Sequence, residues 1–319
     1  MAFFYLNISS VGRGAGRSAV ASAAYRAGER LREERTGRVH NHAQRRDVVH
    51  TEIFVPEQFA GQPLDWARNR ERLWNTADRA EKRHNSRLAR EYQVTLPAEL
   101  NPEQRLSLAR AFSREIAERY GVAVDLAVHD PRPEGDPRNF HAHLLTTTRE
   151  VTPTGLGAKI GLDMGALDRY RRGLPNHKAE YTNVRQQWAQ LTNAALREAG
   201  LDVRVDHRSL AAQGIDREPR PRIPYHHLRL ERGGQRSEIA EEIRAQYQER
   251  VQQRVQREQG KAAGQHLAGS VPPTDLEEVR RQAREAWLAM RTAAGAGPAA
   301  EQDRGAGVPA RAAEDDLAR

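Results

Sequence analysis

The stretch His129–Leu145, HDPRPEGDPRNFHAHLL, decides how the rest of the chain can be arranged. It contains three histidines with the spacing H-x(11)-H-x-H, so His141 and His143 are two residues apart. Because side chains alternate between the faces of a β-strand, a strand through this pair places both imidazoles on one face. His129 ends an earlier strand-like run, VAVDLAVH (residues 122–129). If the two strands are neighbours, three neutral imidazoles converge on one point.

Three histidine ligands with open coordination positions are typical of a catalytic metal site rather than a closed structural one. An isolated H-x-H is more often only a half-exposed strand face, and the third histidine at the end of a second strand favours the metal site. A second H-x-H, His40 and His42, lies in the polar, Gly-containing segment 32–46. We expect that segment to be a mobile basic loop and not a metal site.

The composition indicates a protein with an anionic partner. Lys and Arg number 51 against 43 Asp and Glu, a net charge of +8 over 319 residues. Most of the basic residues are arginine, which suits bidentate contact with phosphate, so nucleic acid is the first candidate; a coding bias towards arginine would give the same excess. The chain has no cysteine, which excludes disulfides, a thiol nucleophile and a thiolate zinc site. It has no apolar run near the roughly 18 residues of a membrane span and no signal pattern at its N-terminus, so we expect a cytosolic protein.

Residue periodicity predicts alternating strands and helices. The strands have one apolar and one polar face, which favours an antiparallel sheet with helices on one face, an α+β fold. Besides the two histidine strands, the expected strands cover residues 2–8, 48–56 and 89–97, and the expected helices cover residues 18–35, 63–82, 101–120, 184–199, 235–260 and 274–292. Residues 9–17 are expected to form a loop, and the region after Arg149 an irregular basic one.

The open face of this sheet is predicted to carry Glu91 beside the histidines, because Glu91 alternates with Tyr92 and Val94. A carboxylate there could orient a histidine by accepting its second N–H, or could take a proton. A divalent ion on the histidines could polarise a phosphoryl oxygen. The nucleophile is either metal-bound water or Tyr25, which lies on an Ala-rich helix where a lone tyrosine is usually a packing residue.

Four segments stand out when they are taken together and in this order: the first strand with SAVASAAYRAG (residues 18–28), REYQVTLP (90–97), LAVH (126–129) followed by NFHAHLL (139–145), and VDHRSLAAQGIDREP (205–219). Together they resemble the relaxase domain of the MobA/MobL family of plasmid mobilisation proteins, in the HUH endonuclease superfamily. The resemblance covers about residues 1–224. It implies an antiparallel sheet with flanking helices, Tyr25 as nucleophile, Glu91 as the supporting acidic residue, and His129, His141 and His143 as metal ligands.

The resemblance also implies a reaction and its partners. Family members nick one DNA strand at the origin of transfer (oriT), stay joined to its 5′ end through phosphotyrosine, and later religate it. We therefore expect Mg²⁺ or Mn²⁺ as cofactor, single-stranded DNA and an oriT hairpin as partners, accessory relaxosome proteins and a coupling protein, and a bacterial cytoplasmic location. Five arginines are expected to contact DNA: Arg13, Arg17, Arg26, Arg138 and Arg208.

The expected organisation is a relaxase domain at residues 1–224, a charged helical extension at 225–292 and a disordered tail at 293–319. Three alternatives remain open from the sequence. They are a rolling-circle replication initiator or transposase of the same superfamily, a metal-dependent hydrolase that uses water, and a non-enzymatic DNA-binding mobilisation accessory.

Overall fold

The structure is a computed structural model that describes residues 3–59, 61–133, 135–270, 281–286 and 288–289. The chain divides into two compact units, Met1–Asp216 and Arg217–Arg319. The sequence placed a boundary somewhat later, after residue 224. His129, His141 and His143 all belong to the first unit.

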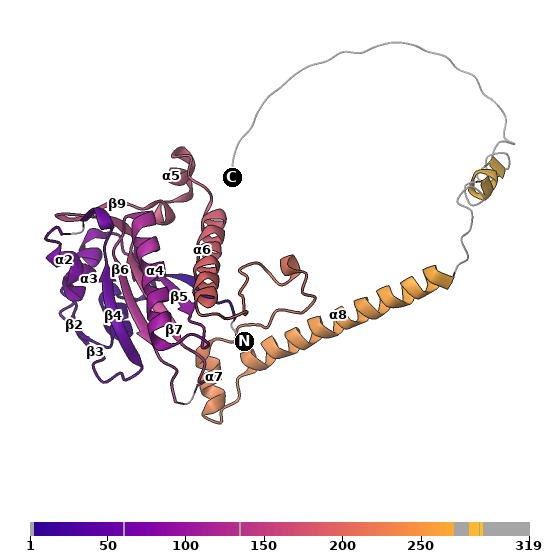
Figure 1. The fold of residues 1–319 in the computed structure, drawn as a ribbon, viewed down its shortest axis with the longest axis horizontal. Coiled ribbons are helices and arrows are strands. Elements are labelled where there is room, and N and C mark those ends of the chain that lie inside the picture. Colours follow the sequence, from indigo (N-terminus) through magenta and orange to yellow (C-terminus); the bar gives the residue numbers. More distant parts are fainter. Residues whose placement is uncertain (1–2, 60, 134, 271–280, 287, 290–319) are drawn as a thin grey trace, which may run out of the picture. The chain divides into compact units, whose positions relative to one another are not determined.

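Five antiparallel strands form the central sheet of the first unit, in the order β1-β5-β7-β6-β4 (Figure 1). They are β1 (Leu6–Gly12), β4 (Val48–Phe54), β5 (Arg87–Thr95), β6 (Val124–His129) and β7 (His141–Thr147). Two small hairpins pair β2 (Arg30–Arg32) with β3 (Val39–Asn41), and β8 (Arg149–Thr152) with β9 (Gly155–Lys159). The antiparallel sheet confirms the α+β prediction, and β6 and β7 are neighbours as the histidine spacing requires.

Helices cover both faces of this sheet, so the expectation of helices on one face is wrong (Figure 1). The helices of this unit are α1 (Ala19–Ala27), α2 (Asp65–Arg68), α3 (Arg70–Ala80), α4 (Pro102–Tyr120), α5 (Ala166–Arg171) and α6 (His177–Glu198), with short 3-10 turns η1 (Arg13–Ala15), η2 (Glu57–Phe59), η3 (Gly161–Asp163) and η4 (Ala211–Gln213). On one face, Phe112 of α4 and Trp188 of α6 pack in a core with Tyr92. On the other, Ala24 of α1 and Trp74 of α3 belong to a second core.

Helix α1 is much shorter than the predicted helix at residues 18–35. Ser18 caps its start by accepting the Ala21 N–H, and Gly28 ends it in a left-handed conformation with φ of 65°. The chain then forms the β2–β3 hairpin where the sequence suggested a mobile loop. Gly28 is a helix-stop residue, but the charged residues that follow it also fit a helical pattern, so the predicted helix continued past Gly28.

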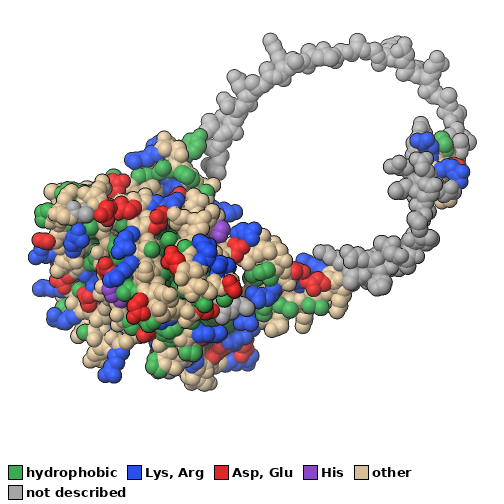
Figure 2. Space-filling view, viewed as in Figure 1, with side chains coloured by type: hydrophobic (Ala, Val, Ile, Leu, Met, Phe, Trp, Pro, Cys, Tyr) green, Lys and Arg blue, Asp and Glu red, His purple; other side chains and the backbone are tan. Residues whose placement is uncertain are grey.

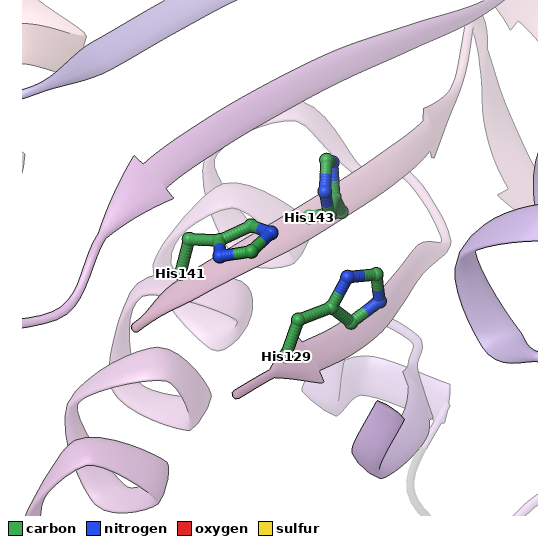
Figure 3. A group of neighbouring side chains, drawn as sticks. All are labelled: His129, His141 and His143. Atoms are coloured by element: carbon green, nitrogen blue, oxygen red, sulfur yellow. The ribbon is translucent and has the colours of Figure 1, made fainter. Parts of the chain in front are cut away.

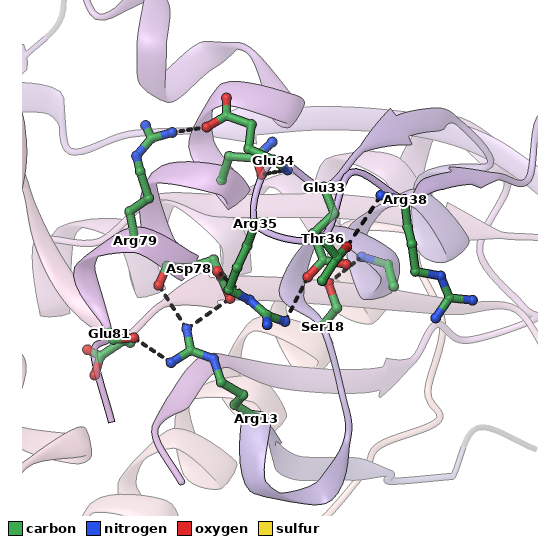
Figure 4. Close-up of polar contacts among 12 residues, drawn as sticks. Arg13, Ser18, Glu33, Glu34, Arg35, Thr36, Arg38, Asp78, Arg79 and Glu81 are labelled. Atoms are coloured by element: carbon green, nitrogen blue, oxygen red, sulfur yellow. Dashed lines mark hydrogen bonds and ion pairs between the residues drawn. The ribbon is translucent and has the colours of Figure 1, made fainter. Parts of the chain in front are cut away.

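Polar contacts fasten this hairpin to α3 (Figure 4). Arg13 and Arg35 both donate to the carboxylate of Asp78 on α3, at 3.0 and 3.1 Å. Arg35 also donates to the buried Glu33 of the hairpin at 3.0 Å, and His40 bonds the other Glu33 oxygen at 3.1 Å. The segment that follows β3 therefore starts from a hairpin that is held in place against α3.

Other boundaries agree with the sequence to differing degrees. The capping box at Asn101 and Gln104 is present as predicted, with bonds of 2.8 and 2.9 Å that start α4. Strand β1 runs to Gly12, so part of the expected loop at residues 9–17 is strand. The region after Arg149, expected to be irregular, contains the β8–β9 hairpin and α5.

The second unit contains α7 (Tyr225–Arg232) and α8 (Glu238–Ser270), which includes most of the helix predicted at residues 235–260. Residues 281–286 and 288–289 are also helical, inside the helix predicted at 274–292. The rest of that helix and the expected tail at 293–319 lie outside the described residues. No helix in the described part of the chain has the length and apolar character needed to cross a membrane. On the face shown in Figure 2, basic and acidic side chains lie interspersed.

Candidate metal centre and tyrosine

Three histidine side chains meet at one end of the sheet, on the face that α1 partly covers; His129 is buried, and His141 and His143 are partly buried. In the β6–β7 register, His129 lies opposite His141 and Ala127 lies opposite His143. The three ring centroids are 5.1, 4.9 and 5.3 Å apart, and one ligand nitrogen from each ring lies within 4.8 Å of the others (Figure 3). The structure therefore brings together the three histidines that the sequence singled out.

Each ring has its other nitrogen fixed by an acceptor outside the group. His129 Nε2–H donates to the carbonyl of Arg26 at 2.7 Å, and His141 Nδ1–H donates to the carbonyl of Asn139 at 2.8 Å. His143 Nδ1–H donates to Glu91 Oε1 at 2.7 Å. Backbone carbonyls and an ionised carboxylate accept hydrogen bonds but cannot donate them, so these bonds select the tautomers and leave the inward nitrogens as lone pairs. The residues present fit a divalent ion held by His129 Nδ1 and by the Nε2 atoms of His141 and His143.

Burial keeps two of these rings in the ligand form. Burial, together with the neighbouring His143, lowers the pKa of His129 to about 3. Burial also lowers the pKa of His141 from its usual value. Both rings are therefore neutral at physiological pH, and neutral imidazole is the form that binds a metal.

Glu91 lies behind His143 and is bound on its other side by Arg26. Arg26 Nε and Nη2 donate to the two Glu91 oxygens at 2.5 and 2.6 Å. Burial raises the pKa of Glu91, but the hydrogen bonds from His143 and Arg26 outweigh burial and hold that pKa well below its usual range. Of the two roles expected for Glu91, the geometry favours orienting the histidine over taking a proton.

The five expected DNA-contacting arginines differ in how free they are. Arg26 is bonded to Glu91, and Arg13 donates to Asp78 and to the backbone of residues 78, 81 and 83, so both guanidiniums are engaged inside the fold. Both guanidiniums therefore bond to acceptors within the protein, and contact of Arg13 or Arg26 with DNA stays a prediction. Arg17 is exposed. Arg138 and Arg208 are also exposed, each bonded to the aspartate two residues before it.

Tyr25 lies on α1 next to this centre, and its side chain is 43% exposed. Arg45 lies over its ring, with Cζ 4.2 Å from the centroid, and Arg45 Nη2 is 3.4 Å from His129 Nδ1. Arg132 Nη2 donates to the Tyr25 hydroxyl at 3.1 Å. The Arg45 guanidinium thus contacts both the Tyr25 ring and His129 Nδ1.

No sequence pattern singled out Arg45, Asp47 and Arg132, which surround Tyr25. They lie in connections, where no periodicity marks which way a side chain points. One signal was available, because Asp47 directly precedes a predicted strand and Arg132 follows His129 by three residues. Pairing those two strands would have placed both residues near the histidine.

Fold and site together define a class, the antiparallel α+β proteins with a three-histidine centre at one end of the sheet. The sequence profile of the MobA/MobL family matches residues 17–233. The chain belongs to the MobA/MobL family, as its motifs indicated.

Relatives of known sequence and structure agree with this assignment. The chain is 37% identical over 240 residues to the mobilization protein MobL of Acidithiobacillus ferridurans, covering 69% of this chain and 61% of that protein. It is 33% identical over 233 residues to a 43 kDa relaxation protein of Salmonella typhimurium, covering 68% of this chain and 57% of that protein. A solved structure described as "Molecular Basis of Vancomycin Resistance Transfer in Staphylococcus aureus" is similar, with 26% identity, a TM-score of 0.53, and coverage of 65% of this chain and all of that chain. The chain thus spans about three fifths of the length of the two relatives.

Proposed function

We propose that this chain nicks one DNA strand at a plasmid origin of transfer and rejoins it, through a covalent 5′-phosphotyrosine intermediate, for conjugative mobilisation. The observation that carries the proposal is the position of Tyr25 beside the three histidines, with Arg45 in contact with both. Family membership and the names of the relatives support it. Tyr25 is assigned as the nucleophile, Glu91 as the residue that supports the ligands, and His129, His141 and His143 as the metal ligands.

The chemistry follows from what the chain's residues hold in place. The Tyr25 hydroxyl oxygen forms a bond to phosphorus, the bond from phosphorus to the 3′ oxygen breaks, and the 3′ oxygen leaves as a hydroxyl. A Mg²⁺ or Mn²⁺ ion on the three imidazoles would polarise the phosphoryl oxygen. Because the all-nitrogen donor set is softer than Mg²⁺ prefers, Mn²⁺ should bind more tightly. One phosphate ester replaces another, so the step is reversible and suits rejoining better than hydrolysis.

The same proposal extends to organisation and partners. Residues 1–224 would form the nicking domain, residues 225–292 a charged helical extension and residues 293–319 a tail. Single-stranded DNA and an oriT hairpin would be the substrate, with accessory relaxosome proteins and a coupling protein acting alongside in the bacterial cytoplasm. Of the five expected arginines, Arg17, Arg138 and Arg208 are exposed and are the best placed to contact DNA phosphates, while Arg13 and Arg26 bond to acceptors within the protein.

The test uses single-stranded oligonucleotides that tile the DNA flanking this gene, incubated with the chain and Mn²⁺. We expect one oligonucleotide to give a protein–DNA adduct that survives denaturing electrophoresis, and Tyr25→Phe to give none. Cleavage without an adduct that persists in Tyr25→Phe would instead identify a hydrolase that uses metal-bound water. Cleavage at a replication origin in place of a transfer origin would favour a rolling-circle initiator.

A further inference from the structure

Three charged side chains form a clamp around Tyr25, which we define as Arg45, Asp47 and Arg132. We propose that Arg132 stabilises the negative charge that develops on the Tyr25 hydroxyl oxygen during attack. Asp47 holds Arg132 in position, and Arg45 holds the tyrosine ring. This inference rests on the proposed function and adds residues to its reacting site. Arg132 is the catalytic member because it touches the reacting atom, and Arg45 and Asp47 are positioning residues.

Arg45 fixes Tyr25 from one side. Its guanidinium lies over the ring, and its Nη1 donates to the backbone carbonyl of Tyr25 at 2.6 Å. Asp47 accepts from Arg45 Nε at 2.9 Å and also from its Nη2, so the guanidinium is held by a fork of two bonds. His42 packs edge-on against the same ring, with centroids 5.3 Å apart. The ring is therefore held over its face and at its edge.

Arg132 reaches the hydroxyl end of Tyr25 from another segment. Its Nη2 donates to the Tyr25 hydroxyl at 3.1 Å. Its Nε lies 3.4 Å from Asp47 Oδ2, the oxygen that also accepts from Arg45 Nη2. One carboxylate is thus shared by two guanidiniums. Arg132 is half exposed, and so is Tyr25, which leaves a phosphodiester access to both.

The clamp is tied to the strand that ends in His129. Val48 pairs with His129 across β4 and β6, and the Asp130 N–H donates to the Asp47 carbonyl at 2.8 Å. Backbone bonds therefore fix Asp47 relative to the histidine, and Asp47 in turn orients Arg132. This linkage sets the spacing between the tyrosine oxygen and the centre that receives the phosphate.

The chemical role of Arg132 follows from its charge. Arginine stays protonated, so it cannot remove the tyrosine proton, and that proton leaves to solvent as the bond to phosphorus forms and the 3′ oxygen gains a proton in return. The guanidinium N–H stabilises negative charge on the hydroxyl oxygen and lies where it can also reach a non-bridging phosphate oxygen. A fixed donor of this kind acts mainly in the transition state.

The decisive measurement is single-turnover adduct formation at saturating concentration of the oligonucleotide that the wild-type chain cleaves. We expect Arg132→Ala to be slower by about 100-fold, the usual effect of removing one such donor. Arg132→Lys should recover part of the rate, because lysine keeps the positive charge but lacks the fixed planar set of N–H donors of the guanidinium. Asp47→Asn should be slower by about 10-fold through misplacement alone. Oligonucleotide affinity should change by less than about fivefold in each.

Arg197→Ala is the matched control, because Arg197 is an exposed arginine of α6, which covers the other face of the sheet. It should react at the wild-type rate. If saturating oligonucleotide restores the wild-type rate to Arg132→Ala, Arg132 is only a DNA-binding residue and the inference is overturned.

A second readout needs no DNA. With 3-fluorotyrosine at position 25, the fluorine resonance should shift on Arg132→Ala and on Asp47→Asn, and should stay unchanged on Arg197→Ala. An unchanged signal in the first two variants contradicts the clamp itself. Absence of any adduct from the wild-type chain contradicts the proposed function, and the catalytic role of Arg132 with it.

Discussion

Glu91 determines which nitrogen of His143 faces the other two histidines. Its carboxylate accepts from His143 Nδ1 at 2.7 Å and is fixed from behind by two bonds from Arg26. The backbone carbonyl of the same Arg26 accepts from His129 at 2.7 Å. One arginine therefore supports two of the three rings, through its side chain for His143 and through its backbone for His129.

Replacing Glu91 by Gln should weaken both metal binding and the fold. The neutral amide accepts a weaker bond from His143 and leaves the Arg26 charge without its partner, which costs about 3 kcal/mol of unfolding free energy. Loss of such a support typically lowers metal affinity about 10- to 100-fold. Mn²⁺ titration calorimetry and a urea melt would measure the two effects.

Glu198→Gln provides the comparison, because Glu198 is an exposed carboxylate at the end of α6. It should leave both quantities unchanged. Wild-type Mn²⁺ affinity in Glu91→Gln would mean that Glu91 does not orient His143.

At this scale the sequence predicts residues on strands better than residues on connections. Strand alternation placed Glu91, His141 and His143 on one face, and the register bears that placement out. Arg45 and Arg132 acquire their role only when two connections distant in sequence meet at Tyr25. The bond between Arg26 and Glu91 could not be predicted from local sequence, because the two residues are 65 positions apart.

The end of helix α1 sets the path of the chain around the tyrosine. Gly28 adopts φ of 65°, and a Cβ there would lie 3.2 Å from Val48 Cγ2. Val48 begins β4 and pairs with His129. The turn at Gly28 thus brings α1, and with it Tyr25, close to β6, the strand that ends in His129.

Gly28→Ala should therefore affect stability and activity together. The left-handed conformation costs an alanine about 1–2 kcal/mol, and the contact with Val48 adds to that cost. We expect a lower melting temperature and adduct formation slowed by about 10-fold, because the tyrosine shifts from its attack position.

Gly37→Ala separates the two causes. Gly37 has φ of 70°, but a Cβ there meets nothing within 4 Å. It should show the conformational cost with a normal rate of adduct formation. Equal rates in the two variants would show that the Gly28 turn does not position Tyr25.

Element types were easier to predict than element ends or layers. Helix α4 has a capping box and a terminal glycine, and its predicted bounds agree with the structure. The predicted helix at residues 18–35 is too long, because the Arg and Glu residues after Gly28 suit a helix as well as a hairpin. The second helical layer was missed because α1 covers the sheet with alanines, which give only a thin apolar stripe.

On the scale of the whole molecule, the candidate site belongs entirely to one of two units. The histidines, Glu91 and Tyr25 all lie within Met1–Asp216, and the two extended hydrophobic cores draw all their residues from that same unit. Helices α7 and α8 belong to Arg217–Arg319. A ligand that binds the histidines should therefore stabilise the first unit without a direct effect on the second.

Adding Mn²⁺ to metal-free chain should raise the melting temperature of the first unit. Binding to the folded state at 100 times the dissociation constant stabilises it by about 2.7 kcal/mol, which corresponds to about 5–10 °C for a domain of this size. Near-ultraviolet circular dichroism would follow Trp74 and Trp188, which are buried in the two cores on either side of the sheet. The helical signal of α8 should melt at the same temperature with and without metal, because no histidine of the site lies in that unit. His141→Ala should remove the shift, and a shift of equal size in that variant would place the ion elsewhere.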